Sequence, residues 1–136
     1  MDFEKLRLYR NIKNNFANLL DIKLSEISEG YAKAEMDVKT ELLNPIGSLH
    51  GGCLYTIADI AGGAAASSYG VHVTTIDGNF HYLRAGINTK KLFATATEIK
   101  RGKKILVYSI SVTDQDDVEL AMGIFSFMSI GKPIEL

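Results

Sequence analysis

The residues best suited to chemistry in this 136-residue chain lie between His50 and Asp59. A His50-Gly51-Gly52 step opens a predicted helix, where the first backbone N–H groups lack partners and the helix dipole favours negative charge. Asp59 then stands alone in the apolar, small-residue segment 53–66, which holds no second acid and no lysine or arginine. Such a carboxylate is costly unless it faces a site, a partner chain or water. The pattern predicts an anion-stabilising donor and one acid or base.

The elements before this segment follow from the spacing of apolar residues. Residues 2–19 are predicted to form an amphipathic helix, with apolar side chains at helical spacing: Leu6, Ile12, Phe16, Leu19 and Leu20. Segments 20–28 and 31–39 predict a hairpin around Glu29-Gly30, because apolar and charged residues alternate in the second segment. After a loop at 44–47, the central helix is predicted over about 50–68.

The rest of the chain predicts strands. Segments 71–83, 91–100, 104–113 and 118–130 are rich in β-branched, aromatic or alternating apolar residues. Turns are predicted at Arg101-Gly102-Lys103 and at 114–117. Helix, two strands, central helix and four strands give an α+β pattern with a largely antiparallel sheet, in one domain that spans residues 1–136.

Composition excludes several classes of protein. Apolar residues make up 46% and charged residues 23% of the chain, and the net charge of −1 predicts no nucleic-acid or anionic-membrane partner. The longest apolar stretches fall far short of the ~20 residues that span a bilayer. The first residues lack the pattern of a secretory signal, and one cysteine permits no internal disulfide. We therefore expect a cytoplasmic domain.

The stretch Asn44-Pro45-Ile46-Gly47-Ser48-Leu49-His50-Gly51-Gly52, with Asp59 nine residues after His50, resembles the PaaI-like acyl-CoA thioesterases. The similarity extends over most of the chain, since segments 75–80 and 82–84 resemble the strand after the helix in that family. Ala85 departs from it, because the family often has proline there. The resemblance implies a hot-dog fold, an antiparallel sheet wrapped around one long helix. It also implies hydrolysis of an acyl-CoA to the free acid and coenzyme A, without metal or organic cofactor.

The resemblance and the chemistry together suggest catalytic roles for five residues. Asp59 is the expected base that activates a water, or the nucleophile that forms an anhydride. The Gly51 N–H is the expected donor to the oxyanion. His50 and Asn44 are expected to orient the thioester or the loop that carries this donor, and the Thr75 hydroxyl to position the water.

Substrate contacts are predicted at further positions. Gly52 and Tyr55 lie beside the expected donor, and Tyr55, Phe80 and Tyr82 are expected to shape the acyl pocket. Three basic residues could meet the phosphates of coenzyme A: Arg84, Arg101 and Lys103. Aromatic acyl groups of the phenylacetyl type and medium fatty acyl chains both remain open.

Each assignment has an ordinary structural alternative. Asp59 could be bonded to backbone or to a partner chain, and Gly51 could serve only a tight turn. Asn44 is a common turn former before proline, and Thr75 needs no functional reason in a strand. Cys53 is better explained as a small buried hydrophobe than as a nucleophile.

The spacing also predicts how the site is assembled. Nine residues at ~100° come to ~900°, half a turn off alignment and ~13 Å along the axis, so Gly51 and Asp59 are predicted to point to opposite sides of the helix. They could not both touch one thioester carbon. A symmetric homodimer would solve this, with Gly51 of one chain meeting Asp59 of the other. The resemblance implies the same arrangement, and a homotetramer of two such dimers remains open. Gly62-Gly63 is expected to admit a neighbouring backbone or the substrate.

Two other hot-dog functions and a structural role compete with hydrolysis. A non-enzymatic acyl-CoA-binding or sensing module would keep the basic surface without needing Asp59. A hydroxyacyl thioester dehydratase usually needs a histidine that works with an acid on the helix, whereas His50 precedes the helix here. A purely structural oligomerisation domain would leave Asp59 unexplained.

Overall fold

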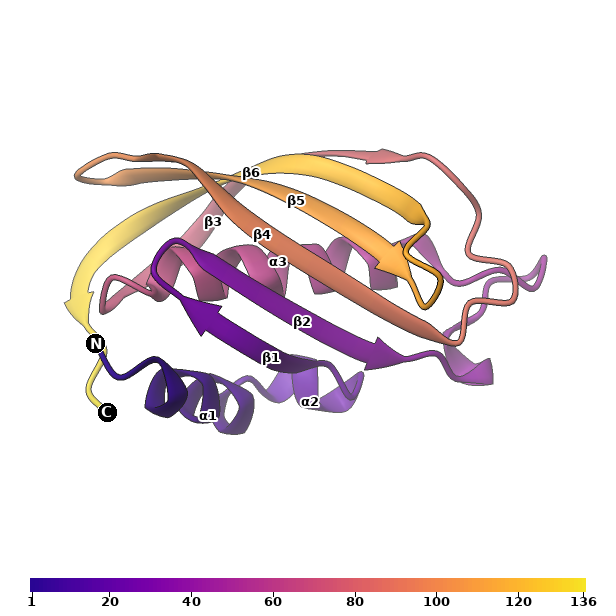
Figure 1. The fold of residues 1–136 in the computed structure, drawn as a ribbon, viewed down its shortest axis with the longest axis horizontal. Coiled ribbons are helices and arrows are strands. Elements are labelled where there is room, and N and C mark those ends of the chain that lie inside the picture. The colour runs from indigo at the N-terminus through magenta and orange to yellow at the C-terminus, as the bar shows by residue number, and fades with distance from the viewer.

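In the computed structural model, which describes residues 1–136, one antiparallel sheet curves over a single long helix (Figure 1). That helix is α3 (Gly51–Ser67), and two short helices lie beside the edge of the sheet, α1 (Phe3–Lys13) and α2 (Asn15–Leu19). The six strands are β1 (Lys23–Ser28), β2 (Tyr31–Asp37), β4 (Lys91–Arg101), β5 (Ile105–Asp114), β6 (Glu119–Pro133) and β3 (Val71–Tyr82), and a 3₁₀ turn covers Thr40–Leu42. None of the helices is both long enough and apolar enough to span a membrane.

The sheet order is β1-β2-β4-β5-β6-β3, and every neighbouring pair is antiparallel. Alternation explains why one face is buried: Ala32, Ala34 and Met36 of β2 point inward and are at most 1% exposed. The strands cover α3 on that face, as the predicted α+β hot-dog architecture requires. The long strand β3 pairs only with β6, so its other edge carries no partner strand.

Helix α3 buries most of its surface under the sheet. Its predicted bounds are confirmed within one residue, and His50 is the N-cap, whose ring accepts the Gly52 N–H. A Cβ on Gly62 would lie 2.7 Å from Cζ of Phe127, so this glycine lets the helix approach the sheet. The expectation that Gly62 admits another backbone or the substrate is therefore wrong. Five residues of α3 are not buried: Gly51, Gly52, Tyr55, Thr56 and Asp59.

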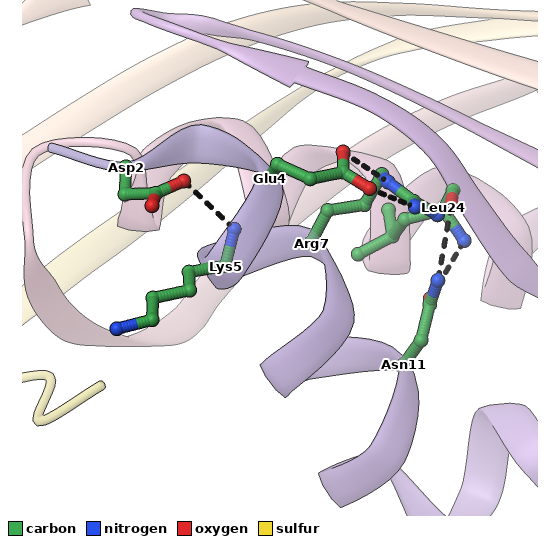
Figure 2. Close-up of polar contacts among 6 residues, drawn as sticks. All are labelled: Asp2, Glu4, Lys5, Arg7, Asn11 and Leu24. Carbon is green, nitrogen blue, oxygen red and sulfur yellow. Dashed lines mark hydrogen bonds and ion pairs between the residues drawn. The ribbon is translucent and has the colours of Figure 1, made fainter.

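The N-terminal helix is anchored to β1 by hydrogen bonds rather than by its whole apolar stripe. Figure 2 shows Arg7 and Asn11 donating to the carbonyl oxygen of Leu24, at 3.1 and 3.0 Å. Asn11 also accepts from the Leu24 N–H at 2.8 Å, while Asp2 caps the helix start and Glu4 pairs with Arg7. These contacts fix the orientation of α1 against the rest of the fold.

The prediction of one amphipathic helix over residues 2–19 is wrong in two respects. The helix breaks at Asn14, which ends α1 and caps α2 by accepting from the Ala17 N–H. Leu6 is fully buried, but Ile12, Phe16 and Leu19 are 69%, 59% and 78% exposed. Ile12 follows Leu6 by six residues, or ~600°, and so lies on another side of α1. The break then turns α2 relative to α1, so Phe16 and Leu19 do not continue the buried face of Leu6.

Candidate active site

The start of α3 leaves one backbone donor unused. The His50 ring accepts the Gly52 N–H through Nδ1 at 2.8 Å, and the His50 carbonyl accepts the Cys53 N–H at 2.9 Å. The Gly51 N–H, the first of the helix, donates to no group of the chain. A Cβ on Gly52 would lie 2.9 Å from His50 Nδ1, so Gly52 is required for this cap. His50 and Gly52 thus organise the helix start and leave Gly51 free to bind an anion.

Gly51 opens into a small pocket. The Tyr82 hydroxyl donates to the Gly51 carbonyl at 3.1 Å, and a Cβ on Gly51 would lie 3.1 Å from Cε1 of the tyrosine ring. The pocket has a volume of about 250 Å³ and is lined by Leu49, Gly51, Leu54, Tyr82, Leu83, Arg84, Ala85 and Gly86. The structure therefore brings Arg84, but not Arg101 or Lys103, to the pocket that holds Gly51.

Asp59 lies half-buried on α3 beside strand β3. The Thr75 hydroxyl donates to its Oδ1 at 2.6 Å. Burial raises the pKa of the Asp59 carboxyl, and the hydrogen bond from Thr75 and the positive charge of Arg10 offset part of that rise. A carboxylate with a raised pKa is a stronger base than an exposed one, so this residue has the properties expected of a general base. The Thr75 hydroxyl, which was expected to position the water, therefore bonds directly to the Asp59 carboxylate.

Gly51 and Asp59 lie on the same exposed stripe of α3, together with Gly52, Tyr55 and Thr56. The prediction that they point to opposite sides is wrong, because the nine-residue spacing separates Asp59 from His50 and not from Gly51. From Gly51 to Asp59 there are eight residues, or ~800°, which leaves the two only ~80° apart around the axis. Their separation along the axis is still ~12 Å, so the two cannot contact one thioester carbon.

Asn44 stabilises its own loop. Its side-chain amide donates to Ser48 Oγ at 2.7 Å, and its Oδ1 accepts the N–H groups of Ile46 and Ser48 at 3.1 Å. It makes no hydrogen bond to His50 or Asp59. Of the two roles expected for Asn44, the structure provides the contacts for shaping the loop that leads to α3.

Aromatic side chains gather between the first half of α3 and strand β3. The ring of Phe80 meets Tyr55 edge-on at 5.5 Å between centroids and Tyr82 at 5.1 Å, and Tyr55 lies 5.1 Å from Phe125. Tyr55 is one turn after Gly51 and one turn before Asp59 on the exposed stripe. The three predicted pocket residues therefore do come together beside the unused donor.

The remaining predicted residues lie elsewhere. Arg101 and Lys103 line a separate cavity of about 390 Å³ together with Tyr69, and the Arg101 guanidinium lies 3.6 Å from the centre of the Tyr69 ring. Tyr69 follows the C-terminal end of α3, and the sixteen steps of 1.5 Å from Gly51 to Ser67 place that end ~24 Å from Gly51 in the same chain. Cys53 is buried and burial raises the pKa of its thiol, which suits a packing role.

One charged residue near the site has no evident signal in the sequence. Arg10 of α1 reaches the face of α3 that carries Asp59, and its charge acts on that carboxyl. The one pattern in the sequence that favours this position is the spacing from Leu6. Arg10 lies one turn after that buried residue and so shares the inward face of α1. No group of three or more histidine, cysteine, aspartate or glutamate side chains is placed to hold a metal ion.

Comparisons with known proteins identify the family of this chain. A sequence profile of the thioesterase superfamily matches residues 46–121, more than half of the chain. The acyl-coenzyme A thioesterase PaaI of Escherichia coli is 33% identical over 106 residues, which cover 78% of this chain and 76% of that protein. The solved structure of E. coli PaaI superposes with a TM-score of 0.86 at 30% identity, covering 95% of this chain and 97% of that one.

Two further solved structures have the same fold. The thioesterase HI1161 of Haemophilus influenzae matches with a TM-score of 0.82 at 27% identity, over 96% of this chain and 91% of that one. The protein smu.793 of Streptococcus mutans, solved with acetyl-CoA bound, matches with a TM-score of 0.78 at 25% identity, over 83% and 91%. The chain therefore belongs to the thioesterase superfamily, as a PaaI-like thioester hydrolase with the hot-dog fold.

Proposed function

We propose that this chain hydrolyses acyl-CoA thioesters in a homodimer with two shared sites, each built from Gly51 of one protomer and Asp59 of its partner. The observation that carries the proposal is the exposed stripe of α3. It presents an unused N–H at one end and a half-buried carboxylate ~12 Å along the axis at the other. Each protomer carries both groups but contributes only one of them to each shared site.

A two-fold axis would bring these halves together. In a symmetric dimer every contact occurs twice, so Gly51 against the partner's Asp59 implies Asp59 against the partner's Gly51. Two antiparallel α3 helices satisfy this when the axis passes near Tyr55, midway along the stripe. The open edge of β3 supports the same association, because an unpaired edge with exposed side chains such as Ile76, 50% exposed, is a surface that proteins normally cover.

The reaction then follows from the two groups. The thioester carbonyl oxygen accepts a hydrogen bond from the Gly51 N–H, and the Asp59 carboxylate of the other protomer takes a proton from a water. The water oxygen forms a bond to the carbonyl carbon, and the resulting oxyanion is stabilised by the same N–H and the helix dipole. Collapse of the tetrahedral intermediate re-forms the carbonyl and breaks the carbon–sulfur bond. The thiolate takes the proton from Asp59 and leaves as the thiol. These steps require no metal or organic cofactor.

The residues around Gly51 suit a coenzyme A thioester. E. coli PaaI is named an acyl-coenzyme A thioesterase, and smu.793 was solved with acetyl-CoA. In this chain the Gly51 pocket has an exposed arginine, Arg84, whose Nη1 donates to the Glu119 carbonyl at 2.7 Å. We propose that Arg84 contacts the phosphates of coenzyme A while the pantetheine arm occupies this pocket. The placement of Arg101 and Lys103 as phosphate ligands remains a prediction for the second cavity.

Thiol release from acyl-CoA and from the matching acyl-pantetheine tests this proposal. Wild-type protein should hydrolyse both, with a lower KM for the acyl-CoA. Arg84→Ala should raise the KM for acyl-CoA about two- to fivefold, the scale of an exposed charge pair, and leave acyl-pantetheine unchanged. The KM of Arg101→Ala for the same two substrates tests whether the second cavity contacts the phosphates of coenzyme A. Tight acyl-CoA binding without thiol release by the wild type would instead favour a binding module and contradict the proposal.

A further inference from the structure

Arg10 occupies an unusual position between α1 and the central helix. Its Nη1 donates to Ser67 Oγ at 3.1 Å, and a Cβ built on Gly63 would lie 3.4 Å from its Nη2. Gly63 and Ser67 follow Asp59 by four and eight residues, so the guanidinium lies along the face of α3 that carries Asp59, about one turn away. A Cβ at that distance would only be in ordinary van der Waals contact with the guanidinium, so the guanidinium lies directly against this turn of α3.

Packing alone does not account for an arginine at this position. Its Nε is buried and has no hydrogen-bond partner, and it forms no ion pair within 4.0 Å. A poorly compensated charge of this kind usually costs stability, and an apolar side chain of similar volume is often as stable or better. Leu6, Arg7 and Asn11 already anchor α1. The arginine therefore needs a reason other than docking the helix.

The charged and polar groups around Asp59 come from three elements. Thr75 of β3 binds its Oδ1, and Arg10 of α1 is the cation whose charge acts on it. Tyr55, one turn earlier on α3, is uncharged at neutral pH, because burial and, to a smaller extent, the charge of Asp59 raise the pKa of its phenol. A small cavity beside Arg10 is lined by the titratable groups Tyr9, Lys13 and His72, and Asp77 lies on β3, two residues after Thr75.

We propose that Arg10 is a positioning residue for hydrolysis, because its fixed charge one helical turn away holds Asp59 in the ionised form that can accept a proton. The inference rests on the proposed function of Asp59 as the base. Burial raises the pKa of the Asp59 carboxyl, and the positive charge of the nearby guanidinium offsets part of that rise. Arg10 suits this task because a guanidinium stays charged even when partly buried.

Arg10→Met tests the inference, because it keeps an unbranched apolar stem and removes the charge. Ser67 keeps its own hydrogen bond to the Ala64 carbonyl at 2.8 Å, so no buried hydroxyl is left without a partner. We expect the acid limb of the pH profile of kcat/KM to move to higher pH, with the rate recovering toward wild type above it. Arg10→Lys, whose amine loses its charge more readily when buried, should fall between wild type and Arg10→Met. Lys5→Met removes a charge from the exposed side of the same helix and should change nothing.

A second readout does not depend on activity. The Asp59 carboxyl titration, followed by carbon NMR with labelled aspartate, should shift to higher pH in Arg10→Met and not in Lys5→Met. Arg10→Gln, which keeps a donor for Ser67, provides a second neutral variant if the methionine variant unfolds. Superimposable Asp59 titrations in the wild type and in the neutral variants would overturn the role of Arg10. A wild type that hydrolyses no thioester would overturn the proposed function, and the NMR comparison would still decide whether Arg10 acts on Asp59.

Discussion

Asp59→Asn should reduce the hydrolytic rate by at least ~100-fold, because it removes the only group at the site that can accept the water's proton. The change is nearly isosteric. The amide oxygen can still accept the hydrogen bond from the Thr75 hydroxyl, which is 2.6 Å long in the wild type. Loss of a partly buried charge also relieves desolvation, so the fold should not be weakened. The measurement is kcat for thiol release from an acyl-CoA, with thermal unfolding as the control for folding.

Asp59→Glu offers a matched comparison for this variant. It keeps the carboxylate but lengthens the side chain by one methylene, so it should retain more activity than the asparagine variant while losing the wild-type geometry. Hydrolysis by Asp59→Asn within a few-fold of wild type would show that the carboxylate is structural. In that case Asp59 would serve only to bind Thr75 and hold α3 against β3.

Gly51→Pro should lower kcat by about 10²- to 10³-fold, the effect of losing one oxyanion donor. Proline has no backbone N–H, and it is well tolerated at the first position of a helix, where that N–H has no intrahelical partner. The preceding residue, His50, has φ −59° and ψ 132°, an extended conformation compatible with a following proline. The variant therefore removes the donor while preserving the helix start.

Gly51→Ala tests whether the reaction needs the Gly51 N–H or the open space beside it. Alanine adds the Cβ that would lie 3.1 Å from the Tyr82 ring but keeps the N–H, and Tyr82 is exposed enough to shift. The alanine variant should therefore retain most of the kcat that the proline variant loses. Equal losses in the two variants would mean that close approach to Gly51, rather than its N–H, is what the reaction requires.

Local patterns were sufficient to predict most of the architecture. All six strands and α3 lie within a few residues of their predicted bounds, because alternation and turn residues such as Gly30 and Gly102 are local signals. Each of these elements depends on residues whose own neighbours along the chain determine their conformation. Thr75 and Asp59 are placed at one site by the family resemblance rather than by a local pattern, and their direct hydrogen bond joins α3 to β3.

Features that depend on how distant segments meet were not predictable from those patterns. Arg10 lies 49 positions before Asp59 in the chain, and only the hydrogen bonds of Arg7 and Asn11 to Leu24 orient α1 so that Arg10 faces α3. The exposure of Phe16 depends on the helix break at Asn14, which one hydrogen bond to Ala17 determines. Likewise, no local signal separates Arg84, beside Gly51, from Arg101, at the far end of α3.

The corrected helix geometry changes the reason for expecting a dimer. Gly51 and Asp59 share one exposed face of α3 and do not point apart, so orientation no longer separates them. What remains is the ~12 Å between them along the axis, together with a face of α3 that the rest of the chain covers only in part. A site divided between two protomers explains why the same stripe carries both groups.

Subunit complementation tests the shared site most directly. Asp59→Asn and Gly51→Pro chains are unfolded together, refolded as a mixture and assayed for thiol release. Random pairing puts half of the dimers in the mixed form, which has one intact site and one doubly defective site, so activity should recover to about a quarter of wild type. Each variant refolded alone should remain inactive. A mixture no more active than the two variants measured separately would contradict the shared site, because Gly51 and Asp59 would then have to act within one chain.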